Sequence, residues 1–203
     1  MRRIAALMGA VAALAGCGSA RETPEQAEAR IAQESAAFKT ALKGIENRWE
    51  AFSAAGQGDS IASLFMEDGR NNPPNEPAQV GRAAIAKAEA AQNGLYTFSL
   101  SILSEDAAAN GPIGVEHGTY GVEGKVKKGA PKGVPAKFSD HGNYLIHWHN
   151  VNGTWQVADL VFTSSQTTPM GAAIMAAVKK ATPRPTAKPA AKPAARKPTT
   201  RRR

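Results

Sequence analysis

The sequence lacks several features that would place it in a well-defined class at once. Cys17 is the only cysteine, so no disulfide can form within the chain. The glycines of residues 111–118 lack the spacing and the following helix that a phosphate-binding loop needs. Ser164 and Ser165 belong to no motif that implies a histidine and an acid as partners. Disulfide-built folds and P-loop nucleotide binding are therefore excluded, and a nucleophilic serine is not expected.

The N-terminus has the pattern of an export signal. Arg2 and Arg3 precede an apolar run over residues 4–15, which is too short to span a bilayer and is typical of a signal peptide. The run ends in Leu14-Ala15-Gly16-Cys17, which resembles the lipobox of bacterial lipoproteins. An ordinary secretory signal, cleaved after Ala15, is the alternative.

The lipobox resemblance implies where the protein resides. Residues 1–16 would be removed, Cys17 would carry the lipid, and residues 17–24 would form a tether. Buried acyl chains anchor a protein by about 0.8 kcal/mol per methylene. We therefore expect a lipid-anchored protein on the periplasmic, extracytoplasmic side of the bacterial cell envelope, with the membrane as its first partner.

Positive charge is concentrated at the other end of the chain. Residues 179–203 hold ten Lys or Arg and no acid, which leaves 15 basic and 17 acidic residues for the rest. We expect residues 169–203, rich in Ala, Pro and Lys, to be a disordered tail, because this composition cannot bury a core. The tail is either simply solvated or attached to an anionic envelope polymer or lipid head groups. Nucleic acid is not an expected partner of an exported protein.

Residues 25–168 show first helical and then strand periodicity. Thr23 and Gln26 form a capping box ahead of a long helix whose apolar stripe includes Phe38, Leu42, Ile45, Trp49 and Phe52 and which Gly56 ends. Further elements are predicted as follows: a helix over Ser60–Met66 capped by Asp59, a loop over Asp68–Pro77, a helix over Ala83–Ala91, a mobile loop over Lys125–Lys137, and strands over Tyr96–Ile102, Ile113–Glu123, Phe138–Asn150 and Trp155–Ser164. Asn152-Gly153 predicts a tight turn between the last two strands. Helices followed by an antiparallel meander predict an α+β fold.

Several segments together resemble the nuclear transport factor 2-like superfamily, especially its ketosteroid-isomerase-like and SnoaL-like branches. They are Ile45 to Phe52, Gly58 to Asp68, Gly81 to Ile85, Gly118 to Tyr120, Gly142 to Trp148 and Gly153 to Val157, in the family's order. The resemblance covers about residues 38–168. It implies N-terminal helices packed on a curved, mostly antiparallel sheet, forming a cone with a pocket, and often a homodimer.

The family also indicates where catalysis would be expected. Steroid isomerases place a carboxylate base five residues after an aspartate that matches Asp68, and this position holds Pro73. A proline cannot take a proton, so the isomerase reaction loses its base. Relatives often carry an aspartate near the position of Asp159, but here it is one residue early, and Leu160 takes its place.

Two sets of residues remain as candidates for the site. His117, His147 and Asp159 are candidates for acid-base catalysis. His147 and His149 share one face of a strand, where a metal would need a third ligand such as His117 or Glu116, but a polar sheet face explains them better. The candidate pocket residues are Trp49, Phe52, Tyr120, Tyr144, Trp148 and Trp155.

The sequence therefore favours a lipoprotein whose cone binds a small apolar ligand or a partner without catalysis, and without a metal or cofactor. An isomerase, cyclase or dehydratase that uses His117, His147 or Asp159 is the first alternative. A structural envelope protein attached through its basic tail is the second.

Overall fold

The computed structural model describes residues 21–166. Cys17 and the basic tail, and with them the predicted anchor and attachment segment, lie outside the described residues. Within residues 21–166, no helix has the length and apolar character that a membrane-crossing segment requires.

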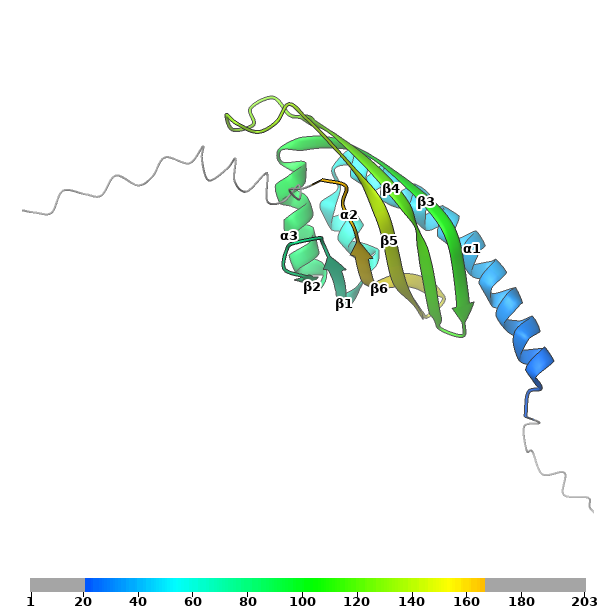
Figure 1. The fold of residues 1–203 in the computed structure, drawn as a ribbon. Helices are drawn as coiled ribbons and strands as arrows, with labels where there is room; N and C mark the ends of the chain where they lie inside the picture. Colours follow the sequence, from blue (N-terminus) through cyan, green and yellow to red (C-terminus); the bar gives the residue numbers. More distant parts are fainter. Residues whose placement is uncertain (1–20, 167–203) are drawn as a thin grey trace, which may run out of the picture.

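Three helices lie on the inner side of a six-stranded sheet (Figure 1). The helices are α1 (Pro24–Ala55), α2 (Gly58–Ser63) and α3 (Arg82–Asn93), and the strands are β1 (Phe65–Asn72), β2 (Gln79–Val80), β3 (Tyr96–Asn110), β4 (Ile113–Val126), β5 (Lys137–Val151) and β6 (Thr154–Phe162). The strand order is β2-β1-β6-β5-β4-β3, and every pair is antiparallel except β1 with β6. The α+β class and the curved, mostly antiparallel sheet are confirmed.

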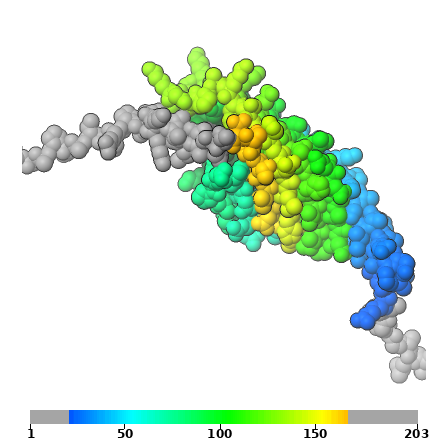
Figure 2. Space-filling view, in the orientation of Figure 1, coloured from blue at the N-terminus to red at the C-terminus, as the bar shows by residue number. Residues whose placement is uncertain are grey.

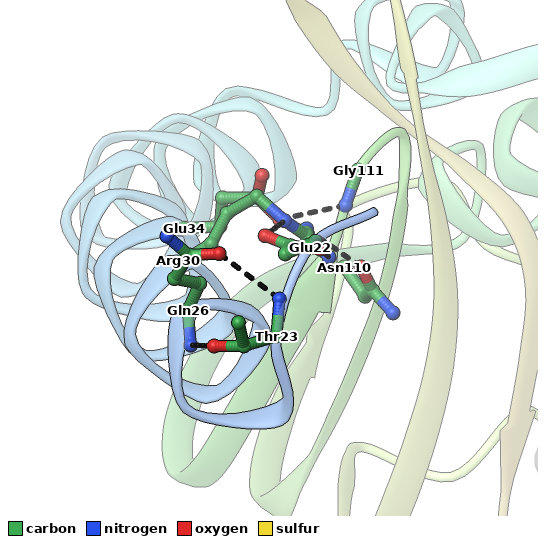
Figure 3. Close-up of polar contacts among 7 residues, drawn as sticks. All are labelled: Glu22, Thr23, Gln26, Arg30, Glu34, Asn110 and Gly111. Atoms are coloured by element: carbon green, nitrogen blue, oxygen red, sulfur yellow. Dashed lines mark hydrogen bonds and ion pairs between the residues drawn. The ribbon is translucent and has the colours of Figure 1, made fainter. Parts of the chain in front are cut away.

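Helix α1 begins and ends as the sequence predicts. The Thr23 hydroxyl accepts a hydrogen bond from the Gln26 amide at 3.3 Å, and the Thr23 amide donates to the Gln26 side chain at 2.9 Å (Figure 3). Gly56 ends the helix with a φ of 67°, a left-handed conformation that glycine adopts without a steric penalty. Phe38, Leu42 and Ile45 are buried, so the predicted apolar stripe is the core-facing side of the helix.

The first turns of α1 are attached to the β3–β4 hairpin. Arg30 donates to the side chain of Asn110 at 2.9 Å, and the Gly111 amide donates to the Glu34 carboxylate at 2.7 Å (Figure 3). The Glu34 carboxylate also accepts from Arg30 at 3.0 Å. These contacts hold the helix in register with the strands that it covers.

Helix α1 also covers the free edge of the sheet. Strand β3 is an edge strand, and two of its backbone amides donate to α1 side chains: Ile102 to Glu50 at 2.8 Å and Ala109 to Ser35 at 3.0 Å. Partners of this kind satisfy edge amides that would otherwise be open to another strand.

The predicted loop over Asp68–Pro77 is wrong for its first half, which belongs to β1. The polar composition of residues 68–72 disfavours a strand, but pairing with a distant part of the chain overrides this local preference. Arg70, Asn71 and Asn72 pair with consecutive residues of β6, and the Asn72 side chain donates to the Leu160 carbonyl at 2.9 Å. The second helix also differs: α2 starts and ends earlier than predicted, and Asp59 is not its cap.

Side chains alternate between an inner and an outer face along the long strands. On β5, Tyr144, Ile146 and Trp148 are buried against the helices, whereas Leu145 is 49% exposed on the other side. Figure 2 shows the outer face, on which the strands follow one another from β6 through β5 and β4 to β3. The two-residue turn at Asn152-Gly153 is confirmed, since both residues have positive φ angles.

The connection between β4 and β5 is attached to the start of β3. Val134 packs against a small second core around Tyr96 and Phe98, and Tyr96 donates to the Pro135 carbonyl at 3.0 Å. This connection extends beyond the end of the sheet (Figure 1). The predicted ends of the loop, Lys125 and Lys137, belong to β4 and β5.

Candidate functional site

A cavity of about 170 Å³ lies between the helices and the inner face of the sheet. Its lining residues come from all three helices and from β1, β3, β4, β5 and β6: Trp49, Ser53, Ile61, Phe65, Asn71, Glu89, Gln92, Phe98, Leu100, Ile102, Tyr120, Val122, Tyr144, Ile146, Leu160 and Phe162. Most of these side chains are apolar, which is typical of a small-molecule site. The cavity is therefore the best candidate for the functional site.

Polar groups are unevenly spread around this cavity. Four of the polar residues, Ser53, Asn71, Glu89 and Gln92, come from α1, β1 and α3. The long strands contribute mainly hydrocarbon surface and two tyrosines, Tyr120 and Tyr144. The cavity thus has a mainly apolar wall formed by β3, β4, β5 and β6, and a partly polar wall formed by the helices and β1.

Glu89 is the only ionisable carboxyl among the described residues that line the cavity. Burial raises the pKa of Glu89 to about 7, because a charged carboxylate is poorly solvated there. The position of Glu89 depends on Gly58, since a Cβ atom at Gly58 would lie 2.9 Å from the Cβ of Glu89. The glycine at the start of α2 thus permits the close helix contact that places the carboxyl group.

A buried carboxylate supports the sheet side of the cavity. Glu116 is 1% exposed and accepts hydrogen bonds from the Tyr144 hydroxyl at 2.6 Å and from the Trp148 indole nitrogen at 2.9 Å. Burial, followed by the hydrogen bond to Glu116, raises the pKa of Tyr144 above its ordinary value. Tyr144 is therefore held neutral and in a fixed orientation.

A second carboxyl lies beside Glu116. Burial raises the pKa of Glu46 to about 7, and the neighbouring Glu116 adds to the rise. The Glu46 Oε1 atom is buried and accepts no hydrogen bond from the described residues. A proton on Glu46 relieves the repulsion between these two groups.

Tyr120 is held in a similar way on β4. Its hydroxyl lies 2.9 Å from Asp140 Oδ2 and 2.8 Å from the Thr163 carbonyl oxygen. Burial, and then the hydrogen bond to Asp140, raises the pKa of Tyr120 above its ordinary value. Both tyrosines of the cavity therefore direct their protons to acceptors of the protein, away from a ligand.

The structure divides the six predicted pocket residues into two groups. Trp49, Tyr120 and Tyr144 line the cavity. Phe52, Trp148 and Trp155 pack in the core instead, where the ring of Trp155 lies 4.4 Å from that of Phe38. The apolar residues of β3 and β6 that complete the wall are absent from the predicted set.

The three candidate acid-base residues lie outside the cavity. His117, His147 and Asp159 are each about half exposed and belong to the outer face of the sheet. His147 lies 3.9 Å from Asp159, and His117 lies 3.8 Å from Glu105, so they form separate surface pairs. Acid-base chemistry in the cone would require them to face the cavity, and they do not.

The pair of neighbouring histidines is also an outer-face feature. The rings of His147 and His149 lie 4.7 Å apart. Glu116, considered from the sequence as a third metal ligand, points to the opposite side of the sheet. Within residues 21–166, no three His, Cys, Asp or Glu side chains gather as a metal site.

Sequence reasoning missed Glu89, although a signal for it exists. Ile85, Glu89 and Asn93 are spaced by four residues and therefore share one face of α3. Ile85 and Asn93 are buried. A glutamate between two core-facing positions of a helix indicates a buried carboxyl.

Comparisons with known proteins concern the fold. No family model and no curated protein matches the sequence. A ketosteroid isomerase-like protein from Erwinia carotovora atroseptica aligns over 66% of this chain and 98% of its own, with a TM-score of 0.52 and 15% identity. A hexachlorocyclohexane dehydrochlorinase aligns over 68% of this chain and 93% of its own, with a TM-score of 0.53 and 12% identity.

A further solved structure carries the name of the fold itself. A nuclear transport factor 2-like protein with a cystatin-like fold from Novosphingobium aromaticivorans aligns over 76% of this chain and 98% of its own, with a TM-score of 0.51 and 13% identity. Identities this low concern architecture and leave activity open. The chain has the nuclear transport factor 2-like fold.

Proposed function

We propose that the domain binds a small, mainly apolar ligand inside its cone. The cavity of about 170 Å³ carries this proposal. Its size is close to that of the apolar cavity of about 150 Å³ that takes up benzene in another protein. Much of the wall belongs to the main hydrophobic core or packs against it, which fixes these side chains in place.

Binding of toluene, followed by calorimetry or ligand-detected NMR, tests the proposal. Leu100→Trp fills the cavity from β3, and we expect it to abolish binding. Leu103→Trp is the matched control, because it lies on the same strand and Leu103 is 63% exposed on the outer face. Toluene binding that survives Leu100→Trp, or that the native protein lacks, contradicts the proposal.

We also propose that this binding domain works at the cell envelope as a lipoprotein. The support is the sequence Leu14-Ala15-Gly16-Cys17. Cys17 precedes the first described residue, Arg21, by four positions, a reach of about 14 Å at most. A lipid there would keep the α1 end of the domain close to the membrane.

Labelling with radioactive palmitate tests the anchor. We expect label in the native chain and none in Cys17→Ser, together with a shift of the variant from the membrane to the soluble fraction. Unlabelled native protein that is recovered in the soluble envelope fraction would favour an ordinary secretory signal.

Glu89 supports a second candidate function, proton transfer on an apolar substrate. A general acid or base works best with a pKa near the working pH, and the pKa of Glu89 is about 7. Turnover of a Δ5-ketosteroid by the native protein, lost in Glu89→Gln, would establish it. An enzyme-like rate would also overturn the non-catalytic interpretation.

A further inference from the structure

The cavity combines aromatic rings with one acidic group. Six of its lining residues are aromatic: Trp49, Phe65, Phe98, Tyr120, Tyr144 and Phe162. Glu89 is the only carboxyl, and the described lining residues include no lysine, arginine or histidine. Aromatic faces attract organic cations, and the attraction grows when water is excluded. The chemistry of the wall therefore favours one sign of ligand charge.

Each class of ligand charge has a different consequence in this cavity. An anionic ligand would meet no positive side chain and would lie near Glu89. A neutral ligand would leave Glu89 protonated and gain only apolar contacts. A cationic ligand would find a counter-charge in Glu89 and ring faces around its remaining surface.

Asn71 adds an acceptor to the same cavity. Its Nδ2 donates to Gln79 at 3.0 Å, while its Oδ1 is buried without a hydrogen-bond partner among the described residues. Buried polar atoms of this kind normally have a partner. An N–H group of a ligand would supply one.

We propose that the cone selects small organic amines with an apolar body, and that the Glu89 carboxylate is the counter-ion of the bound ammonium group. This inference rests on the proposed binding function and names the ligand class. The bound state consists of an ammonium ion, an ionised Glu89 and a surrounding set of aromatic rings. The proton that Glu89 held before binding passes to solvent.

The charged groups around Glu89 indicate that the proton released on binding comes from Glu89 itself. Elements α2, β1, β2 and β3 pack against α3. Their titratable or charged residues are Asp59, Glu67, Asp68, Arg70, Tyr96, Glu105 and Asp106, none of which lines the cavity. Among the described residues that line the cavity, the other ionisable groups are Tyr120 and Tyr144, and their raised pKa values keep both neutral. Burial alone raises the pKa of Glu89, so a cation beside it must lower that pKa and release a proton below pH 7.

A set of four probes of similar size tests the selection. Benzylamine is cationic, benzyl alcohol and toluene are neutral, and benzoate is anionic. We expect benzylamine to bind at least about tenfold more tightly than benzyl alcohol at pH 8, and benzoate to bind most weakly. Calorimetry at pH 6 in buffers of different ionisation enthalpy should show the release of most of one proton for benzylamine and none for toluene.

Two variants connect the preference to the carboxyl group. Glu89→Gln should remove both the preference for benzylamine and the proton release. Glu28→Gln removes the same charge from an exposed position on α1 and should change neither property. If Glu89 served only in helix packing and did not contact the ligand, the proton release on benzylamine binding would not be lost in Glu89→Gln.

The outcomes separate this inference from the function on which it depends. Equal binding of benzylamine and benzyl alcohol, or a preference that survives Glu89→Gln, overturns the amine inference. If toluene binds while the amine preference is absent, the proposed binding of a small apolar ligand is still supported. If none of the four probes binds, both are wrong. Proton release measured on the native protein keeps the test decisive even if Glu89→Gln fails to fold.

Discussion

The two faces of the sheet carry chemistry of opposite kinds on the same strands. On β5, Tyr144 and Trp148 point inward and donate to the buried Glu116, whereas His147 and His149 point outward. The inner face packs against helices that carry Glu46 and Glu89, two carboxyl groups whose pKa burial raises. The outer face holds histidines and Asp159, and the contacts of Asp159 with Arg70 and His147 are longer than 3.5 Å at exposed or half-exposed positions.

This comparison shows that a chemically attractive residue type does not identify the functional side of a sheet. Histidine titrates near neutral pH without help, so it stands out in a sequence. Glutamate reaches the same range only when burial raises its pKa, as for Glu89 and Glu46. The carboxyl groups whose pKa lies near 7 are therefore glutamates, a residue type that does not stand out in a sequence as histidine does.

The largest expected difference between the two faces is at neighbouring residues of β4. Glu116→Leu leaves the Tyr144 hydroxyl and the Trp148 indole nitrogen buried without their acceptor. We expect the free energy of unfolding to fall by about 3–5 kcal/mol, measured by urea denaturation followed by tryptophan fluorescence. His117→Leu, one residue along and half exposed, should change it by less than about 0.5 kcal/mol. Similar losses of unfolding free energy in both variants would mean that the inner and outer faces of the sheet do not differ in their contribution to stability.

The next difference is between two glycines of the same strand. A Cβ atom at Gly118 would overlap the backbone carbonyl oxygen of Leu103 and lie 2.8 Å from the Tyr144 hydroxyl. Because backbone must move, Gly118→Ala should lower the free energy of unfolding by about 2–3 kcal/mol. Gly121 has open space where a Cβ would stand, so Gly121→Ala should be neutral or slightly stabilising when both variants are compared by urea denaturation. A tolerated Gly118→Ala would show that the β3–β4 contact is looser than the structure has it.

A smaller effect depends on pH and compares inner with outer carboxyls. The pKa of Glu46 rises from 4.5 to about 7 on folding, so the folded protein holds a proton that the unfolded chain has already released. The free energy of unfolding therefore falls as the pH rises from about 4.5 to about 7, and then levels off. Glu46→Gln should stabilise the protein at pH 8 by about 1 kcal/mol, a value reduced for solvent screening, and hardly at pH 4.5.

Thermal melts at pH 4.5, 6 and 8 provide the measurement. Glu105→Gln removes a carboxyl of the outer face that is half exposed, and its melts should follow those of the native protein at all three pH values. If Glu46→Gln destabilises the protein at pH 8, the raised pKa of Glu46 is wrong.

Much of the fold was predictable because local signals agree with the tertiary structure. The capping box at Thr23, the stripe on α1 and the Asn152-Gly153 turn each depend on neighbours a few residues away. Strand β1 was not predictable in this way. Its residues form a strand because β6, some ninety positions later, offers a parallel partner, as the bond from Asn72 to Leu160 shows.

The site was less predictable than the fold. Period-two alternation correctly puts Tyr144 and Trp148 on one face and His147 on the other. It does not say which of the two faces lines a cavity, nor that Trp148 lies behind the wall while Tyr144 forms it. The spacing of Ile85, Glu89 and Asn93 puts Glu89 on the buried face of α3, but it does not reveal the close packing of α2 at Gly58 that places the carboxyl group.

The smallest expected effect is on the outer face itself. His147 and Asp159 lie 3.9 Å apart at positions that are about 40% exposed, and half-exposed pairs of this length contribute little. His147→Ala and Asp159→Asn should each change the free energy of unfolding by less than about 0.5 kcal/mol and leave toluene binding within twofold of the native value. Calorimetry on both variants, with Leu100→Trp as the positive control for loss of binding, measures this directly. Because neither side chain borders the cavity, a marked loss of binding in His147→Ala would mean that the outer face controls the cone. The division of the sheet into a binding side and an exposed side would then have to be abandoned.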